Sequence, residues 1–390
     1  MEEWAEGIPS DPMPLAMLGL YLHIPFCSAI CNYCNFNRGL FDAALKERYL
    51  AALETEIRRS AHSGRPEADT IYFGGGTPSL LEPEEIGRII RACRETVDVS
   101  ADAEITMEAN PETVNESRLA AFREAGVNRL SYGVQSFRNE ELRRLSRLHD
   151  ADRARHAFAE ARAAGFDNVS LDLMMWLPEQ RVDDWLLSVD AAIALAPEHL
   201  SLYLLEVYPN APLKDDMARA RWSQAPDEDA EAMYLTAMER LESAGLIQYE
   251  ISNVARPGRQ SWHNLKYWTD GEWLGFGCGA HSTRGGVRWK NLSSTEEYVD
   301  AVSRGRPTAV DVRRMTLDEQ LGDALFTGLR LTDGIDLDAV ESRYDVDIWA
   351  RFGKELERFV EGGWLVREPS RLRLTRSGML LAHEVMTVFV

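Results

Sequence analysis

Residues Tyr21–Phe36 read YLHIPFCSAICNYCNF. Within this stretch Cys27, Cys31 and Cys34 are spaced as C-x3-C-x2-C. They follow an apolar run, Gly19–Ile24, which is typical of a buried strand. Three thiolates this close together suit a soft metal site, either an iron–sulfur cluster or zinc. Structural zinc is usually held by four protein ligands, and no further Cys or His follows at zinc-finger spacing. The spacing therefore favours a cluster of four irons that three cysteines hold, with one iron left open.

The C-x3-C-x2-C spacing resembles that of the radical SAM superfamily. In such proteins the open iron chelates the amino and carboxylate groups of S-adenosylmethionine and gives it an electron, which breaks the sulfonium bond and leaves a 5′-deoxyadenosyl radical. The cofactor carries this chemistry, while the protein supplies position and shielding. The resemblance implies a [4Fe-4S] cluster on the three cysteines, with S-adenosylmethionine beside it. Zinc and a chance spacing are the alternatives.

The composition is that of a globular protein from a reducing compartment. The 390 residues suggest two or three domains of about 150 residues each, and 45% of them are hydrophobic, enough for a large core. There are five cysteines, and Cys93 and Cys278 are isolated, so a disulfide framework is excluded. Residues 1–15 have no features of a signal peptide, and no apolar run is long enough to span a bilayer. We therefore expect a soluble, cytoplasmic protein.

The chain carries a net charge of −20. A protein that binds the phosphate backbone of nucleic acids needs a basic face. Some radical SAM enzymes modify tRNA, and a local basic patch would be compatible with the net charge. We nevertheless expect no nucleic-acid partner.

Short apolar runs alternate with amphipathic helical stretches from Gly19 to about Leu205. The expected strands are Gly19–Ile24, Thr70–Phe73, Glu104–Glu108, Arg129–Gly133, Val169–Leu173 and His199–Leu204. The expected helices are Asp42–Arg59, Glu84–Val97, Glu112–Glu124, Glu140–Leu148, Ala151–Ala164 and Asp183–Ala194. This alternation predicts an α/β fold with a parallel sheet and helices outside it. Six such units fit a partial (β/α)6 barrel, the usual radical SAM architecture, whose chemistry lies at the carboxyl ends of the strands.

The character of the sequence changes from about Met315. The expected elements there are the helices Leu317–Leu329, Leu337–Tyr344 and Ile348–Glu361, a small hairpin, and a last helix Arg376–Val390. They predict a mainly helical, winged-helix-like domain that packs over the open side of the barrel rather than on DNA. The predicted division is an N-terminal tail at 1–18, the radical SAM partial barrel core at 19–205, a barrel extension carrying His263–Trp268 at 206–310, and the C-terminal winged-helix-like domain at 311–390.

Candidate ligand-binding residues directly follow the expected strands. Gly74–Pro78 reads GGGTP, and consecutive glycines let backbone N–H groups approach a ligand, here the methionyl end of S-adenosylmethionine. A tight turn is the alternative. Glu108 ends the third strand, where a carboxylate can accept a hydrogen bond from the ammonium group of the ligand. The Asn-Pro that follows it also favours a simple helix-entry turn.

Three further candidates stand at the ends of later elements. Gln135 follows the fourth strand and can hydrogen-bond the ligand. Arg147 lies at the end of the next expected helix, where it is either a bidentate fork for a carboxylate or an ordinary surface arginine. Asp172 ends the fifth strand, where it either binds ribose hydroxyls or is a buried, hydrogen-bonded aspartate.

Together these motifs resemble the oxygen-independent coproporphyrinogen III oxidase family of radical SAM proteins over nearly the whole chain. The resemblance places the ligand-binding positions of the family on Tyr21, Cys27, Cys31, Cys34, Gly75, Gly76, Thr77, Glu108, Gln135, Arg147 and Asp172, and it places Tyr33 near the adenine. The family usually reads D-L-x-x-G-L-P-G after Asp172, but Trp176 and Glu179 replace these two glycines here. Larger side chains at these positions would narrow the cavity near the ribose or reshape the substrate face. This departure puts an identical mode of tetrapyrrole entry in doubt.

Two branches of this family compete, the oxidase and a haem-trafficking chaperone. The oxidase has a longer segment before its cluster and a further cysteine two residues after the third ligand, where this chain has Phe36. Residues Trp262–Trp268 read WHNLKYW and resemble the H-N-x-x-Y-W signature of the chaperone branch. The resemblance implies a haem chaperone that binds haem, a [4Fe-4S] cluster and S-adenosylmethionine and delivers haem to apo-haemoproteins, with respiratory proteins as candidates. The alternatives are the oxidase, which decarboxylates two propionates, and another radical SAM tetrapyrrole enzyme such as a haem-degrading methyltransferase.

His263 is the candidate axial ligand of the haem iron, because neutral imidazole is a common ligand of haem. The neighbouring Trp262, Tyr267 and Trp268 offer flat apolar surface to a macrocycle, although such a cluster is otherwise typical of core packing. Weaker candidates are His23, His281 and Cys278. The resemblance also implies a cluster-dependent homodimer, and it leaves a peripheral membrane association through partner proteins open.

Overall fold

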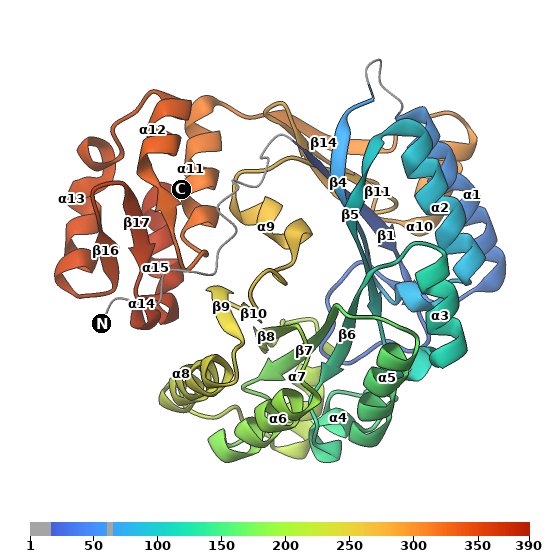
Figure 1. Cartoon of the computed structure of the whole chain (residues 1–390), viewed down its shortest axis with the longest axis horizontal. Helices are drawn as coiled ribbons and strands as arrows, with labels where there is room; N and C mark the ends of the chain where they lie inside the picture. The colour runs from blue at the N-terminus through green and yellow to red at the C-terminus, as the bar shows by residue number, and fades with distance from the viewer. Residues whose placement is uncertain (1–16, 61–64) are drawn as a thin grey trace.

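The computed structural model describes residues 17–60 and 65–390. The predicted N-terminal tail, residues 1–18, therefore lies almost entirely outside the described residues. The described chain forms one large sheet with helices outside it and a smaller C-terminal unit (Figure 1). The large sheet has 12 strands in the order β14-β13-β12-β11-β1-β4-β5-β6-β7-β8-β10-β9.

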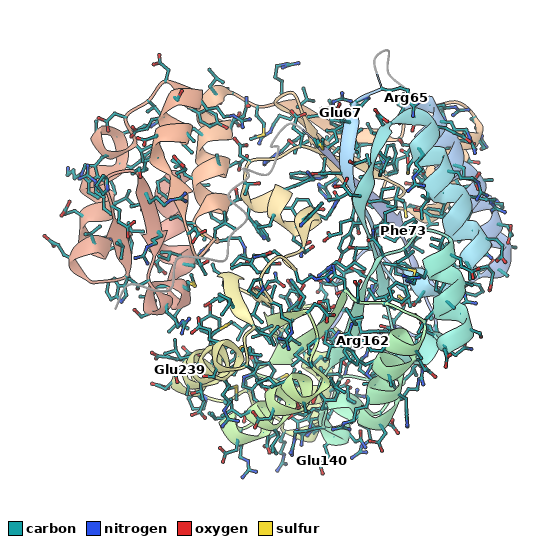
Figure 2. The ribbon with its side chains drawn as sticks, viewed as in Figure 1. Arg65, Glu67, Phe73, Glu140, Arg162 and Glu239 are labelled. Atoms are coloured by element: carbon teal, nitrogen blue, oxygen red, sulfur yellow. The ribbon has the colours of Figure 1, made fainter. Side chains whose placement is uncertain are left out.

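The central strands of this sheet, from β11 to β8, run parallel. They are β11 (Trp273–Phe276), β1 (Leu18–Ile24), β4 (Glu67–Gly75), β5 (Asp98–Ala109), β6 (Arg129–Gln135), β7 (Val169–Met175) and β8 (His199–Leu204). All the strands expected from the sequence are present among them. Leu20, Leu22 and Phe73 are completely buried, because helices cover the outer face and other segments cover the inner face. Figure 2 shows Phe73 inside the molecule and Glu140 at its periphery.

The outer helices connect the parallel strands (Figure 1). They are α1 (Ala43–Arg59), α2 (Pro83–Thr96), α3 (Glu116–Glu124), α4 (Asn139–Arg144), α5 (Ala151–Ala163) and α6 (Val182–Leu195). Two of them differ from expectation. Helix α3 begins at Glu116, because Pro111–Thr113 forms a 3-10 turn and Asn115 caps the helix through the amide of Arg118. Helix α4 ends at Arg144, because Ser146 has a left-handed backbone with φ +55°. The partial (β/α)6 barrel is confirmed.

Antiparallel strands lie at both edges of the sheet, so the barrel does not close. They are β10 (Asn253–Ala255) and β9 (Ile247–Glu250) at one edge and β12 (His281–Arg284), β13 (Val287–Asn291) and β14 (Ala309–Arg314) at the other. Helix α9 (Trp262–Trp268) joins the two edges on the concave side of the sheet (Figure 1). Its first amides, those of Trp262 and His263, both donate to the carboxylate of Glu104 on β5 at 3.2 Å. The remaining helices of this part are α7 (Pro212–Ala220), α8 (Asp227–Ser243) and α10 (Thr295–Ser303).

The C-terminal unit is mainly helical, as expected, and β15 adds a third strand to the expected hairpin. Its elements are α11 (Leu317–Gly328), β15 (Ile335–Asp336), α12 (Leu337–Tyr344), α13 (Ile348–Glu361), β16 (Leu365–Arg367), β17 (Arg371–Leu374), α14 (Arg376–Leu380) and α15 (Ala382–Met386). The prediction of one last helix over Arg376–Val390 is wrong. The helix breaks at Leu381, and the chain ends in a 3-10 turn that packs Phe389 edge-to-face against Phe352 of α13 at 5.1 Å. None of the helices in the described part of the chain is both long and apolar enough to cross a membrane.

The half-buried carboxylate of Glu56 fastens the β11–β13 extension to the outer helices. Glu56 of α1 accepts hydrogen bonds from the Gly277 amide, the Asn291 side-chain amide, the Tyr298 hydroxyl and the Thr308 hydroxyl at 2.7–2.8 Å. Burial raises the pKa of Glu56 despite these four donors. Because four donors depend on this carboxylate, it determines how the extension packs against the barrel.

We expect Glu56→Ala to lower the free energy of unfolding by about 3 kcal/mol, because it leaves buried donors without an acceptor. Urea unfolding followed by circular dichroism measures the change. The control is Glu47→Ala on the same helix, where the side chain is 65% exposed and a change within about 0.5 kcal/mol is expected. Equal midpoints for the two variants would contradict a fastening role for Glu56.

Candidate cofactor site

The three cysteines of the C-x3-C-x2-C stretch line one cavity of about 390 Å³. They lie on the loop that follows β1, in which β2 (Phe26–Cys27) pairs with β3 (Gly39–Leu40) and so closes the loop at its base. Within the loop the amide of Cys34 donates to the carbonyl of Cys31 at 3.2 Å. All three thiols of this loop are partly exposed, whereas the two isolated cysteines are buried.

The arrangement of these thiols suits a polynuclear cluster. Within residues 17–60 and 65–390, no group of three or more Cys, His, Asp or Glu side chains converges closely enough to hold a single metal ion. In a [4Fe-4S] cluster each thiolate binds a different iron, so the thiols need to share a cavity without meeting at one point. Burial is the main cause that raises the pKa of Cys27, and the nearby Cys34 and Cys31 raise it further. This thiol therefore keeps its proton at neutral pH until a metal displaces it.

The glycine loop after β4 docks on the cysteine loop through its backbone. The Gly76 amide donates to the Ile24 carbonyl and the Thr77 amide to the Phe26 carbonyl, both at 2.8 Å. A Cβ atom on Gly76 would lie 2.7 Å from the Phe26 carbonyl oxygen, so no larger residue fits. Gly75 has φ +116°, which side chains rarely adopt. The loop therefore needs glycine at both positions to lie against the cysteine loop.

Glu108 lies at the carboxyl end of β5 and faces this glycine loop. One carboxylate oxygen accepts from the Gly75 amide at 3.1 Å and the other from the Tyr72 hydroxyl at 3.0 Å. Burial, followed by the nearby carboxylate of Asp172, raises the pKa of Glu108 to about 7. A cation that enters the cavity would stabilise the ionised form of this carboxylate.

Arg147 is not the surface arginine that the sequence left open as an alternative. Its side chain lines the cavity and donates through Nη2 to the Asn110 side chain at 2.8 Å and to the Gly133 carbonyl at 2.6 Å. Its Nη1 lies 3.4 Å from the sulfur of Cys31. Arg147 thus connects two strand ends to the cysteine loop.

Asp172, in the middle of β7 rather than at its end as expected, and Gln135, the last residue of β6, complete the wall of the cavity. Asp172 accepts from the Ser131 hydroxyl at 3.1 Å, and burial raises its pKa to about 6. Gln135 has φ +69°, an uncommon backbone conformation for a residue with a side chain. Such local strain occurs where the surrounding structure fixes a side chain at a site.

The two tyrosines predicted for the site lie in different places. Tyr33 lines the cavity and packs against the buried side chain of Leu145 and its neighbours. Tyr21 is not among the residues that line the cavity. Its hydroxyl lies 3.1 Å from Nδ1 of His23, and its ring stacks on Tyr72 with the ring centroids 6.2 Å apart.

The structure does not bring His263 to this cavity. Its side chain is buried inside the barrel, where Nδ1 lies 2.8 Å from the Thr70 hydroxyl and Nε2 lies 2.9 Å from the Tyr267 hydroxyl. Burial, together with the charges of Lys266 and Arg129, lowers the pKa of His263 to about 3. His263 is therefore neutral, and both of its ring nitrogens are already hydrogen-bonded.

Sequence reasoning missed Asn32, which lies between the second and third cysteines. The side-chain amide of Asn32 donates to the Arg144 carbonyl and to Asp216 of α7, both at 2.8 Å. The backbone carbonyl of Asn32 accepts from the Leu213 amide at 2.9 Å. Helix α7 thus holds the cysteine loop from outside. An asparagine between two cysteines of the motif is a polar residue that needs partners. Those partners lie far away in the sequence, so no local pattern identifies them.

Trp176 and Glu179, which replace two family glycines, both have left-handed backbones, with φ +61° and +58°. Neither is among the residues that line the cavity, so the expected narrowing near the ribose is not observed. The Trp176 indole donates to the Ala225 carbonyl at 2.8 Å, and the Glu179 carboxylate accepts from the Ser223 amide at 2.8 Å. The two side chains therefore fasten the segment that joins α7 to α8. These hydrogen bonds compensate for the strain of the left-handed backbones at Trp176 and Glu179, which glycines would avoid.

Comparisons with known proteins agree with this geometry. The radical SAM superfamily matches residues 21–192, and the HemN C-terminal domain matches residues 315–381. The chain is 37% identical over 376 residues to "Heme chaperone HemW" of Bacillus subtilis, across 96% of this chain and 99% of the relative. It is 35% identical over 399 residues to "Radical S-adenosyl methionine domain-containing protein 1, mitochondrial" of Bos taurus, across 97% of this chain and 89% of the relative.

The fold is also similar to a solved structure, coproporphyrinogen III oxidase (HemN) from Escherichia coli. The TM-score is 0.85 at 25% identity, and the match covers 96% of this chain and 90% of that chain. The chain therefore belongs to the radical SAM superfamily and, within it, to the HemW family.

We expect Asp216→Ala to loosen the cysteine loop, because it removes the charged acceptor of the Asn32 amide. A hydrogen bond to a charged group contributes about 1.5–3 kcal/mol, so alkylation of Cys31 and Cys34 in the metal-free protein should become about tenfold faster. Mass spectrometry of the labelled peptides measures the rate. The control is Asp215→Ala, an exposed neighbour on α7. Equal alkylation rates in the two variants would show that α7 does not hold the loop.

Proposed function

We propose that the protein is a haem chaperone that carries a [4Fe-4S] cluster and S-adenosylmethionine and passes haem to apo-haemoproteins. The observation that carries the proposal is membership of the HemW family over nearly the full length of the chain. The name "Heme chaperone" belongs to the relatives, and its transfer to this chain is part of the proposal. Respiratory haemoproteins are the candidate acceptors, and the cytoplasm is the proposed location.

Cys27, Cys31 and Cys34 would hold the cluster, which would supply reductive chemistry toward S-adenosylmethionine when loaded and reduced by an external electron donor. The other cavity residues are assigned by their chemistry. The backbone of Gly75, Gly76 and Thr77 would line the methionyl end, and the carboxylate of Glu108 would pair with its ammonium group. Arg147 would bind the ligand carboxylate, Asp172 and Gln135 the ribose side, and Tyr33 the adenine. Tyr21 would support the site indirectly, because its ring stacks on Tyr72, whose hydroxyl donates to Glu108.

The oxidase is the second candidate, because its fold is so similar. Phe36 argues against it. The oxidase pattern has a cysteine at this position, whereas here a phenylalanine that is 66% exposed lines the cavity. The Trp262–Trp268 stretch, which resembles the chaperone signature, also favours the chaperone. A homodimer, a membrane association through partner proteins and the absence of a nucleic-acid partner remain part of this proposal.

The two candidates can be separated by anaerobic reconstitution with iron and sulfide, followed by parallel titrations with haem and with coproporphyrinogen III. We expect a stable haem spectrum and no decarboxylated product by chromatography. Transfer of the bound haem to an apo-haemoprotein, followed by its absorption spectrum, tests delivery. Turnover of coproporphyrinogen III would instead identify the chain as an oxidase.

We expect the affinity for S-adenosylmethionine to rise between pH 6 and pH 7.5. The free protein holds Glu108 protonated below its pKa of about 7, and a positively charged ligand binds to the ionised form, so binding below that pH must release a proton. The affinity should rise roughly fivefold to tenfold over this range. Equilibrium dialysis with the reconstituted protein measures it, with iron content checked at each pH.

Glu108→Gln should bind more weakly and lose this pH dependence. The control is Asp102→Asn at the exposed opposite end of β5, which should keep the wild-type profile. An unchanged profile in Glu108→Gln would remove Glu108 from the ammonium site.

A further inference from the structure

A second cavity lies beside the sheet extension, away from the cysteines. It has a volume of about 670 Å³, within the range of small-molecule sites, and shares no lining residue with the cysteine cavity. Its walls come from α9, from the edge strands β11 to β14 and from α11 of the C-terminal unit, elements that Figure 1 shows around the upper part of the open barrel. The cavity thus lies where the barrel extension meets the C-terminal unit.

Aromatic side chains form much of this wall. Tyr267 contacts Trp273 edge-to-face at 4.6 Å between ring centroids, and Trp268 at 6.1 Å. Trp268 is itself covered by the guanidinium group of Arg330 at 4.3 Å, and Trp289 of β13 also lines the cavity. These rings are held by one another, so they offer a preformed apolar surface to a flat ligand.

One histidine of this cavity has a free imidazole. His281 on β12 is exposed and lines the cavity, and its ring makes no hydrogen bond to any other described residue. Its backbone pairs with Lys290 of β13, and its carbonyl also accepts from the Trp273 indole at 3.0 Å. Partial desolvation by the cavity walls, followed by the charge of Lys290, lowers the pKa of His281, so its ring is neutral at neutral pH. His263 differs, because both of its ring nitrogens are already hydrogen-bonded.

Basic side chains stand around the same cavity. They form ion pairs that join Arg288 to Asp323 at 2.6 Å, Lys290 to Asp311 at 3.0 Å and Arg313 to Glu319 at 2.8 Å. The basic partners are 37–60% exposed, and ion pairs this exposed contribute little to stability. An incoming carboxylate can therefore replace Asp311 or Glu319, which are 71% and 40% exposed, at small cost, whereas Asp323 is only 30% exposed. Because acids balance the bases around the cavity, a doubly negative ligand must gain most of its affinity from the apolar wall and the imidazole.

We propose that this second cavity is the haem site, with His281 as the axial ligand, the Tyr267, Trp268 and Trp273 rings against the macrocycle, and Lys290 and Arg288 at the propionates. The assignment rests on the proposed function. Ligation needs no proton release, since the neutral imidazole nitrogen donates its lone pair to the haem iron in place of a water molecule. Haem and the cluster would then occupy separate cavities.

The test is a titration of the full-length protein with ferric haem, followed by the Soret band and electron paramagnetic resonance. Wild type should bind with an imidazole-ligated spectrum. His281→Ala should lose that signature and at least about tenfold in affinity, and added free imidazole should restore the signature. The matched control is His156→Ala, an exposed histidine on α5, which should behave as wild type.

A second arm tests the propionate contacts. Lys290→Glu should weaken binding of ferric haem about threefold to tenfold but leave binding of its dimethyl ester unchanged, because the ester carries no carboxylates. Equal losses for both probes would overturn this contact.

The outcomes distinguish a failure of the haem-site assignment from a failure of the proposed function. If wild type binds haem and His281→Ala shows the same spectrum and affinity, the site assignment is overturned and the proposed function stands. A loss of the imidazole signature in His263→Ala, with His281→Ala unaffected, would also overturn it. If wild type binds no haem, the proposed function itself fails.

Discussion

The cofactor site depends on a backbone contact between two loops. The Gly76 and Thr77 amides bond to carbonyls of the cysteine loop at 2.8 Å, and the approach is so close that a Cβ on Gly76 would meet the Phe26 carbonyl oxygen at 2.7 Å. The parallel sheet makes this contact available, because it brings the carboxyl ends of β1 and β4 side by side. Once the loops are joined, Glu108 reaches the Gly75 amide, and the polar side chains of the next strands lie around one cavity.

The inner face of this barrel carries polar side chains, whereas the interior of most parallel barrels is filled by layers of apolar side chains. Glu104 and Arg129 are buried there with their charged groups 3.9 Å apart, and buried charges are costly unless hydrogen bonds satisfy them. Helix α9 satisfies Glu104 with its first two amides and places His263 against Thr70 and Tyr267. The histidine of this signature thus packs in the barrel interior while Tyr267 and Trp268 line the second cavity, and iron ligation by His263 would have to break one of its two hydrogen bonds.

Features set by local patterns were predictable from the sequence, and features set by distant contacts were not. The parallel strands and the glycine loop follow from short apolar runs and the GGGTP sequence, so their order already placed Glu108 and Asp172 at one edge. Asn32 and Asp216 are 184 residues apart, and no local pattern connects them. Trp176 appeared as a departure from a family motif, but its role depends on a carbonyl 49 residues away. The final helix was predicted too long, because the packing of Phe389 that turns the chain is tertiary.

Strand β11 gives the cysteine loop and the second cavity a common support. It pairs in parallel with β1, the strand that leads into the cysteines, and it continues into the turn that ends at His281. Asn37, at the end of the cysteine loop, connects β1 to the turn after β11. Its backbone carbonyl lies 2.7 Å from Nε2 of His23 on β1, and its side-chain amide donates to the Cys278 carbonyl at 3.1 Å. A rigid connection of this kind fixes the distance between two sites. Energetic coupling between them would additionally require an element with two arrangements whose balance both sites shift.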